Sequence, residues 1–127
     1  MEIADDDVIA GTREVVAIAE LSAWLAGGLD PAQLFSEAER RYAHSKSDPD
    51  RRLAARLATK RAARRLLGDD IGLSELEVVR HFGRPPALKL SAVARARLLR
   101  MGAGRTLLSL THGQTHAAAA VLLLRDG

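Results

Sequence analysis

The sequence contains no cysteine among its 127 residues. This absence excludes a disulfide framework, a thiolate metal site and a cysteine nucleophile, and it fits a reducing, cytoplasmic location. Aromatic side chains make up only 3% of the sequence, so the core has to be built mainly from alanine, leucine and valine. No apolar run approaches the roughly 20 residues that a membrane-spanning helix needs, and no secretory signal pattern opens the chain.

The length and composition are those of one globular domain, which predicts a single unit over residues 1–127. The sequence is 47% hydrophobic and 28% charged, values typical of chains that fold around a core. Residues 1–7 are short, polar and acidic, and we expect them to form a flexible tail.

The net charge of +3 conceals an uneven distribution along the chain. Residues 1–50 contain eleven acidic and four basic side chains, whereas residues 51–127 contain five acidic and fifteen basic ones. The two parts therefore carry net charges of −7 and +10. A basic half of this kind favours an anionic partner such as a phosphate, a nucleic acid or an acidic protein.

The pattern of apolar residues and turns predicts an α+β fold in which helices pack on one antiparallel sheet. The strongest element is a helix at 50–67, a segment of alanine, leucine and arginine that lacks glycine and proline and is followed by Gly68. The apolar run at 117–125 fits a strand or a helix by periodicity alone. We expect strands at 8–12 (with a possible extension through 14–18), 75–80, 87–90, 106–111 and 117–125, and helices at 20–26, 31–44, 50–67 and 91–101.

The predicted helix at 50–67 carries seven basic side chains and no acidic one between Arg51 and Arg65. Like charges four residues apart repel, and each such pair destabilises a helix by about 0.3 kcal/mol. One interpretation is a solvated face on which arginine stems cover apolar surface. The other is a binding surface for a phosphate-bearing ligand or an acidic partner, whose charge offsets the repulsion.

Two further segments carry groups that could take part in chemistry. Hydroxyls and imidazoles at 109–112 and at His116 could hold a phosphate or transfer a proton, although a histidine in a turn is often structural. The turn at 83–86 requires no functional explanation. The sequence contains no P-loop, no G-x-G-x-x-G motif and no close spacing of metal ligands, so no metal site is predicted from spacing.

Several segments match the motifs of one family in the order in which that family has them. Residues 11–16 stand where it opens with a strand that reads roughly G-I-D-(I/L)-V-E-I, and residues 35–39 stand where it has F-(S/T)-x-x-E. Residues 51–68 match the long signature R-x-(F/L)-A-x-R-(F/W)-A-x-K-E-A-x-x-K-A-x-G. Residues 83–85 match a Gly-x-Pro turn, and residues 109–112 match a closing S-(I/L)-(S/T)-H. The chain therefore resembles the holo-acyl-carrier-protein synthases, the small 4′-phosphopantetheinyl transferases.

The resemblance implies a fold and an activity. The fold is the α+β fold of these transferases, in which a homotrimer has a site at each subunit interface. The activity is Mg²⁺-dependent transfer of 4′-phosphopantetheine from coenzyme A to a serine of acyl carrier protein. Phosphate-binding residues of the family have counterparts at Arg56, Lys60, Arg65 and His112.

The resemblance also has a departure at the metal site. The two acids that hold Mg²⁺ in the family correspond to Arg13 and Arg61, and a guanidinium has no lone pair for a metal ion. Glu14, next to Arg13, could provide one carboxylate instead. The phosphate-binding residues are retained and the metal-binding residues are altered. The sequence therefore predicts binding of coenzyme A or phosphopantetheine more firmly than it predicts the transfer reaction.

We therefore expect a protein that binds coenzyme A, or the phosphopantetheine or acyl chain of a carrier protein. We expect that it has lost Mg²⁺-dependent transfer and that it has been repurposed in polyketide or fatty-acid biosynthesis. An alternative is an active holo-acyl-carrier-protein synthase. A second alternative, a nucleic-acid-binding module, depends on charge alone, because aromatic side chains for base stacking are scarce. The expected ligand-binding residues are Arg13, Arg56, Lys60, Arg61, Arg64, Arg65, Gly83, Pro85, Ser109 and Thr111, and the acid–base candidates are His112, His116 and Glu14.

Overall fold

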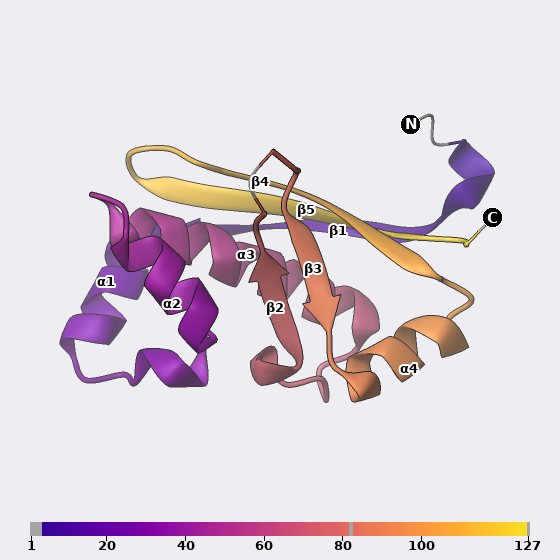
Figure 1. Cartoon of the computed structure of the whole chain (residues 1–127), viewed down its shortest axis with the longest axis horizontal. Coiled ribbons are helices and arrows are strands. Elements are labelled where there is room, and N and C mark those ends of the chain that lie inside the picture. Colours follow the sequence, from indigo (N-terminus) through magenta and orange to yellow (C-terminus); the bar gives the residue numbers. More distant parts are fainter. Residues whose placement is uncertain (1–3, 82, 127) are drawn as a thin grey trace.

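The computed structural model describes residues 4–81 and 83–126 and has the expected α+β fold (Figure 1). Three short 3₁₀ turns, η1 (Asp5–Asp7), η2 (Pro31–Gln33) and η3 (Leu73–Glu75), accompany the main elements. The main elements in chain order are β1 (Val8–Ala17), α1 (Ile18–Ala26), α2 (Glu37–His44), α3 (Pro49–Leu67), β2 (Leu76–Val79), β3 (Ala87–Leu90), α4 (Ala92–Arg100), β4 (Arg105–His112) and β5 (His116–Leu124).

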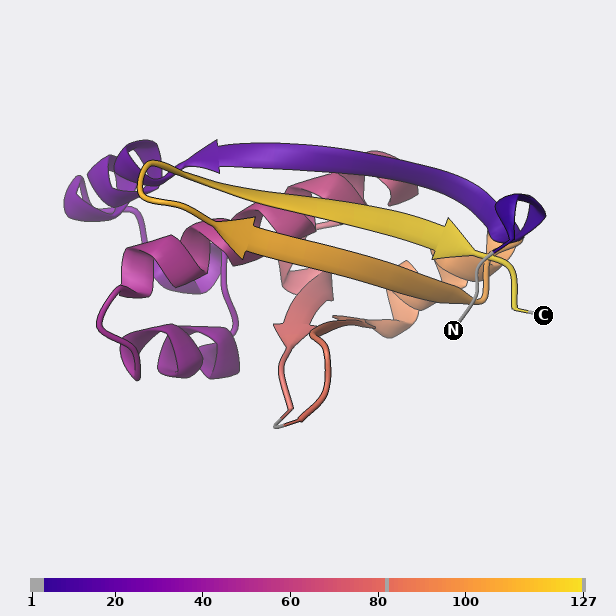
Figure 2. The same cartoon turned by 90° about the horizontal axis from the view of Figure 1, so that it is seen from above.

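The long strands form an antiparallel sheet in the order β1-β5-β4. Figure 2 shows these three strands side by side, and in Figure 1 the α-helices lie on one side of them. Val16, Ala117, Ala119, Val121 and Leu123 point toward this side and are buried. Strand alternation sends the intervening residues to the opposite, outer face of the sheet.

The hairpin of β2 and β3 forms a sheet of its own and does not extend the main one. The expectation of one antiparallel sheet therefore needs this correction. The strands of the hairpin have four residues each and cross the main sheet at an angle (Figure 1). The turn that joins them contains Gly83, which has a φ of +75°, a conformation that favours glycine.

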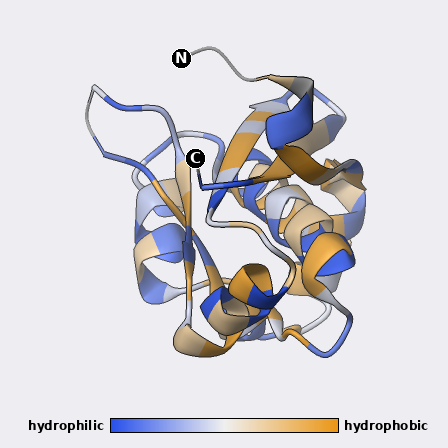
Figure 3. Cartoon of the chain, turned by 90° about the vertical axis from the view of Figure 1, so that its right-hand side faces the viewer, coloured by the Kyte–Doolittle hydropathy of each residue, from blue (hydrophilic) through white to orange (hydrophobic). Residues whose placement is uncertain are grey.

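Helix α3 lies at the centre of the structure, and residues 53–60 are buried without interruption. Two groups of buried apolar residues meet along it: one around Leu53 and Leu57, and the other around Leu67 and Leu98. The helical ribbons in Figure 3 alternate between hydrophilic and hydrophobic residues, as expected for helices that pack on one side. None of the helices in the described ranges is both long and apolar enough to cross a membrane.

The prediction of a single helix at 31–44 is wrong, because the segment forms a short 3₁₀ turn and a separate α-helix. Asp30 caps only the turn η2, where its Oδ1 accepts a hydrogen bond from the Ala32 amide at 3.0 Å. A second start signal follows: Ser36 Oγ accepts from the Glu39 amide, and Glu39 Oε1 accepts from the Ser36 amide. This capping box starts α2 and leaves the buried Phe35 in the connecting segment.

The acidic start of the chain, expected as a tail, is folded in part. Asp5–Asp7 form the turn η1, and the Asp7 carbonyl accepts a hydrogen bond from the Arg125 amide at 2.8 Å. The part of that prediction that concerns residues 1–3 lies outside the described residues. The two ends of the chain are thereby joined next to the sheet.

Candidate functional site

The basic side chains of α3 face two different parts of the structure. Arg56 and Lys60 face α2 and the β2–β3 hairpin, whereas Arg61 and Arg65 face α1 and β1. The two sides therefore have to be described separately.

Lys60 and Glu39 form a buried ion pair between α3 and α2. Each residue is 1% exposed, and Lys60 Nζ donates to Glu39 Oε1 at 2.5 Å and to the Leu34 carbonyl at 2.8 Å. The Val78 amide donates to Glu39 Oε2 at 2.8 Å, which adds β2 to the network. Burial lowers the pKa of Lys60, while the neighbouring Glu39 carboxylate opposes this effect. Lys60, expected as a ligand-binding residue, already has an internal partner.

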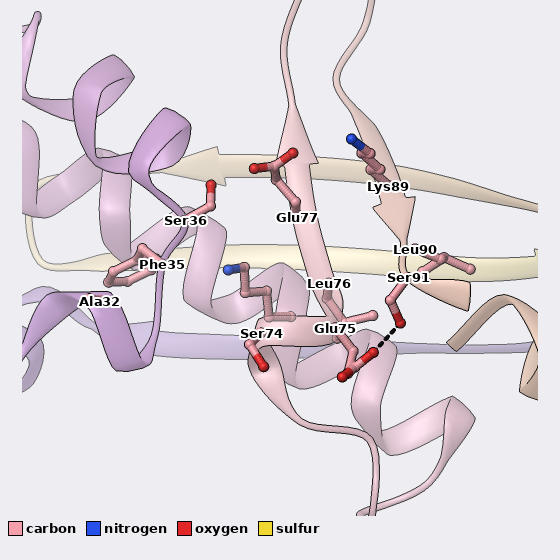
Figure 4. Close-up of a pocket in the computed structure, with 11 residues that line it drawn as sticks. Ala32, Phe35, Ser36, Ser74, Glu75, Leu76, Glu77, Lys89, Leu90 and Ser91 are labelled. Carbon is pink, nitrogen blue, oxygen red and sulfur yellow. Dashed lines mark hydrogen bonds between the residues drawn. The ribbon is translucent and has the colours of Figure 1, made fainter. Parts of the chain in front are cut away.

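A pocket of about 270 Å³ lies next to this pair. In Figure 4 the strands β2 and β3 form one wall of the pocket, and the segment with Phe35 and Ser36 forms the other. Glu77 and Lys89, which are cross-strand partners, both line it. The sequence analysis missed this pocket, since it exists only because the hairpin packs against a segment about 40 residues earlier in the chain. Its lining residues are Ala32, Phe35, Ser36, Lys60, Ser74, Glu75, Leu76, Glu77, Lys89, Leu90 and Ser91.

A second pocket, which we name the cationic hollow, lies between α3, the hairpin and the end of β4. Its volume is about 240 Å³. It adjoins a wider depression of about 700 Å³ that includes Lys46, Gly83 and Arg84. The structure thus brings together the expected site residues Arg56, Thr111 and His112, with Gly83 close by. The cationic hollow is lined by Tyr42, Arg52, Arg56, Arg80, Pro86, Leu110, Thr111 and His112.

Arg56 is buried in the wall of the cationic hollow, where it packs on Tyr42. It is 3% exposed, its Cζ lies 4.3 Å from the centroid of the Tyr42 ring, and its Nη1 donates to the Arg52 carbonyl at 3.3 Å. Burial lowers the pKa of Arg56, but a guanidinium stays charged in proteins. Its buried Nε has no hydrogen-bond partner within residues 4–81 and 83–126. A buried donor of this kind needs an acceptor, such as a water molecule, an ion or a ligand atom.

His112 lies at the end of β4 beside the same cations. Burial lowers its pKa, and the positive charge of Arg52 lowers it further, while Asp48 opposes the shift. The imidazole is therefore neutral at neutral pH. Its buried Nδ1 lacks a hydrogen-bond partner among the described residues. An anion in the cationic hollow would raise the pKa of this histidine.

On the other side of α3, the structure separates Arg13 from Glu14. The two are neighbours in β1, so they point to opposite faces of the sheet. Glu14 faces α3 and its Oε1 lies 3.0 Å from Arg65 Nη1, whereas Arg13 is exposed on the outer face. The carboxylate that faces the basic helix from β1 is therefore Glu14. Arg61 lies one turn before Arg65, with its Cζ 5.4 Å from the centroid of the Trp24 ring.

The remaining expected site residues lie elsewhere. Ser109 and Pro85 are exposed, the former on the outer face of β4 and the latter in the hairpin turn, and Arg64 is half-buried on α3. His116 is exposed at the start of β5, where its Nδ1 lies 2.9 Å from Thr115 Oγ1. Since β1 and β4 are the two edges of the sheet, one chain does not bring Glu14 and His112 together.

The repulsion within α3 is offset partly by carboxylates of the chain itself. Asp48 lies 3.6 Å from Arg51 and 3.2 Å from Arg52, and the hydrogen bond from Arg52 holds the pKa of Asp48 low although burial opposes it. Glu39 and Glu14 pair with Lys60 and Arg65. These carboxylates take over part of the role that the sequence suggested for a bound anion. The interpretation of α3 as a solvated face is wrong, because Arg56 and Lys60 are buried.

The residues present do not fit the two-carboxylate Mg²⁺ site that the resemblance implies. Glu14 is one carboxylate and is already paired with Arg65, and the second position holds Arg61, which has no lone pair to donate. The part of the chain that the structure describes contains no group of three or more histidine, aspartate or glutamate side chains that could hold a metal ion.

The fold is shared with solved holo-acyl-carrier-protein synthases. The enzyme of Neisseria meningitidis superposes with a TM-score of 0.82 at 15% identity, covering 93% of this chain and 99% of that chain. The complex of the Chronobacterium ammoniagenes enzyme with coenzyme A superposes with a TM-score of 0.74 at 26% identity, covering 92% and 97%. These structures define the class of the fold.

Sequence relatives define the family. The chain is 38% identical over 120 residues to the holo-[acyl-carrier-protein] synthase of Anaeromyxobacter dehalogenans strain 2CP-1, a match that covers 90% of this chain and 94% of the relative. It is 37% identical over 94 residues to the synthase of Chlamydia trachomatis serovar D, covering 71% and 76%. No protein-family model matches the chain. The chain belongs to the holo-[acyl-carrier-protein] synthase family.

Proposed function

We propose that this protein transfers 4′-phosphopantetheine from coenzyme A to a serine of an acyl carrier protein. The observation that carries the proposal is the match to holo-[acyl-carrier-protein] synthases over 90% of the chain, and the cationic hollow supports it. This favours the active synthase over a binding protein that has lost transfer. The carboxylate of Glu14 facing α3 supports the same choice, because it leaves an acidic group beside the basic helix.

The cationic hollow is the site for the anionic nucleotide part of coenzyme A. Its arginines offer paired N–H groups that suit phosphate oxygens. The unpartnered Arg56 Nε and the neutral His112 can each form a hydrogen bond with the ligand. Solved relatives of the same fold were obtained in complex with coenzyme A, among them the Helicobacter pylori synthase.

A homotrimer would unite the two halves of the site. Glu14 and His112 lie at opposite edges of the sheet in one chain, so a neighbouring copy is needed to place both beside one ligand. The outer face of the sheet suits such contact, since Val15 and Leu107 are exposed on it next to small residues such as Gly11 and Ala120. An apolar face of this kind favours association with a partner.

The reaction exchanges one phosphorus–oxygen bond for another. The serine oxygen of the carrier protein forms a bond to the phosphorus of the phosphopantetheine phosphate. The bond from that phosphorus to the bridging oxygen of the diphosphate breaks, and adenosine 3′,5′-bisphosphate leaves with the electron pair. The serine proton passes to Glu14 or to solvent, and the cations of α3 stabilise the charge on the leaving group.

An intact-mass assay tests the proposal. The protein is incubated with coenzyme A, apo carrier proteins of fatty-acid and polyketide systems, and Mg²⁺, beside a positive-control synthase. We expect one carrier to gain the mass of a single phosphopantetheine group. Absence of any gain of mass would refute the proposal. Binding of coenzyme A in that case would support the non-transferring role, for which the exchange at Arg61 is the specific argument.

A further inference from the structure

We infer that Arg61 supplies the positive charge that Mg²⁺ supplies elsewhere in the family, so that transfer by this protein needs no divalent metal. The inference rests on the proposed function and concerns how the same site treats the diphosphate. It starts from the disagreement between the residues present and a two-carboxylate metal site.

Net charge is the first argument. Two metal-binding carboxylates and one Mg²⁺ sum to zero. In this chain Arg13 points away from α3, so the groups beside the helix are Glu14 and Arg61, whose charges also sum to zero. Exchange of one acid for arginine raises the charge of the protein by two, which equals the charge of the ion. The net charge of this pair of positions and the ion is thereby kept without the metal.

The positions of the side chains are the second argument. The Arg61 guanidinium lies over the Trp24 ring, a contact that holds the group without using its N–H donors. Arg65 lies one turn later on the same side of α3 and is oriented by Glu14 at 3.0 Å. The N–H donors of Arg61 are thus left available to face an anion, and a guanidinium can bind two phosphate oxygens at once.

The chemistry suits a fixed guanidinium. Phosphoryl transfer develops negative charge on the leaving oxygen, and preorganised cations stabilise that charge without reorganising. Arginine performs this task in other phosphoryl-transfer sites. Since a guanidinium stays charged at all ordinary pH values, its contribution does not depend on metal concentration.

The test is the loading assay with metal removed. Protein, coenzyme A and carrier are treated with a chelating resin and assayed in EDTA and again with added Mg²⁺. We expect the wild-type rate to be the same in both. Arg61→Glu, which recreates the second carboxylate, should slow metal-free loading by about 100-fold, and Mg²⁺ should restore much of the rate. Arg95→Glu, the same charge change at an exposed position of α4, should leave the metal response unaltered.

Metal binding provides an independent readout. In electron paramagnetic resonance, wild-type protein with coenzyme A should take up no more Mn²⁺ than coenzyme A alone, and Arg61→Glu should take up more. If the Arg61→Glu variant does not fold, Arg61→Gln replaces it, and circular dichroism checks the folding of both variants. Arg61→Gln should lose metal-free loading without rescue by Mg²⁺, and wild-type rates in this variant would contradict the inference.

Loading by the wild type only with Mg²⁺ overturns the inference and leaves the proposed function intact. No loading under either condition overturns both.

Discussion

Lys60 and Arg61 are neighbours in the sequence, yet they lie in opposite environments. Lys60 is enclosed with Glu39 between three elements and both side chains are almost fully buried. On the Arg61 side, the pair of Arg65 and Glu14 has side chains that are 60% and 24% exposed. A helix turns by about 100° per residue, so one step along α3 separates a cation that holds the fold together from one that is free to meet a ligand.

Breaking the buried pair should have the largest effect. Lys60→Met leaves the Glu39 carboxylate buried without its partner, and we expect the free energy of unfolding to fall by about 3–5 kcal/mol. Urea unfolding measures the change. Arg41→Met, which breaks the exposed pair with Glu37, is the matched control and should change the free energy by less than about 0.5 kcal/mol. Equal effects of the two variants would show that the buried pair is not a structural element.

Arg56 lies on the same side of α3 as Lys60 but borders the cationic hollow. We expect Arg56→Gln to weaken binding of adenosine 3′,5′-bisphosphate by about 10-fold to 100-fold, because hydrogen bonds to charged groups contribute roughly 1.5–3 kcal/mol. Isothermal titration calorimetry measures the affinity. Arg56→Lys keeps the charge but loses the planar contact with Tyr42, so it should recover only part of the affinity. Unchanged binding in both variants would place the nucleotide elsewhere.

The comparison also shows what the sequence could and could not predict. Helix α3 was predictable because its composition and its flanking proline and glycine act locally. The ion pair of Lys60 with Glu39 was not, because it joins residues 21 positions apart that meet only after α2 has packed. The false continuous helix at 31–44 arose because Asp30 and Ser36 both give a start signal, and only the capping box of Ser36 opens an α-helix.

The same limit applies to the site. The resemblance implied that Arg56 and His112 bind phosphate, and in the structure both line the cationic hollow. The faces of Arg13 and Glu14 depend on how β1 pairs with β5, and a shift of one residue exchanges them. The Trp24 contact that positions Arg61 joins α1 to α3, and nothing in either segment alone indicates it.

The pKa of His112 tests whether the nucleotide binds in the cationic hollow. Burial and nearby arginines hold its pKa in the free protein below the usual value, and a bound anion should raise it. Nucleotide binding should therefore strengthen as the pH falls from the pKa of the bound protein toward the lower pKa of the free protein. The window for stability lies between the usual value of about 6.5 and the folded pKa. In the free protein the unfolded state binds the extra proton in this window, so stability falls as the pH falls. Nuclear magnetic resonance of the imidazole, with His112→Asn to identify its signal, measures both pKa values. Identical values with and without nucleotide would contradict the placement of the anion.

The exposed pair should show the smallest effect, and a double-mutant cycle measures it directly. Glu14→Gln, Arg65→Gln and the double variant should give a coupling free energy of about 0.2–1 kcal/mol, because solvent screens the pair and two long side chains lose freedom when they meet. The coupling should shrink further in high salt, since the Debye length falls to about 3 Å at 1 M. The cycle uses urea unfolding under the conditions of the Lys60→Met experiment. A coupling as large as the loss in Lys60→Met would mean that Glu14 is held for stability, and the division of α3 into a structural side and a reactive side would then be wrong.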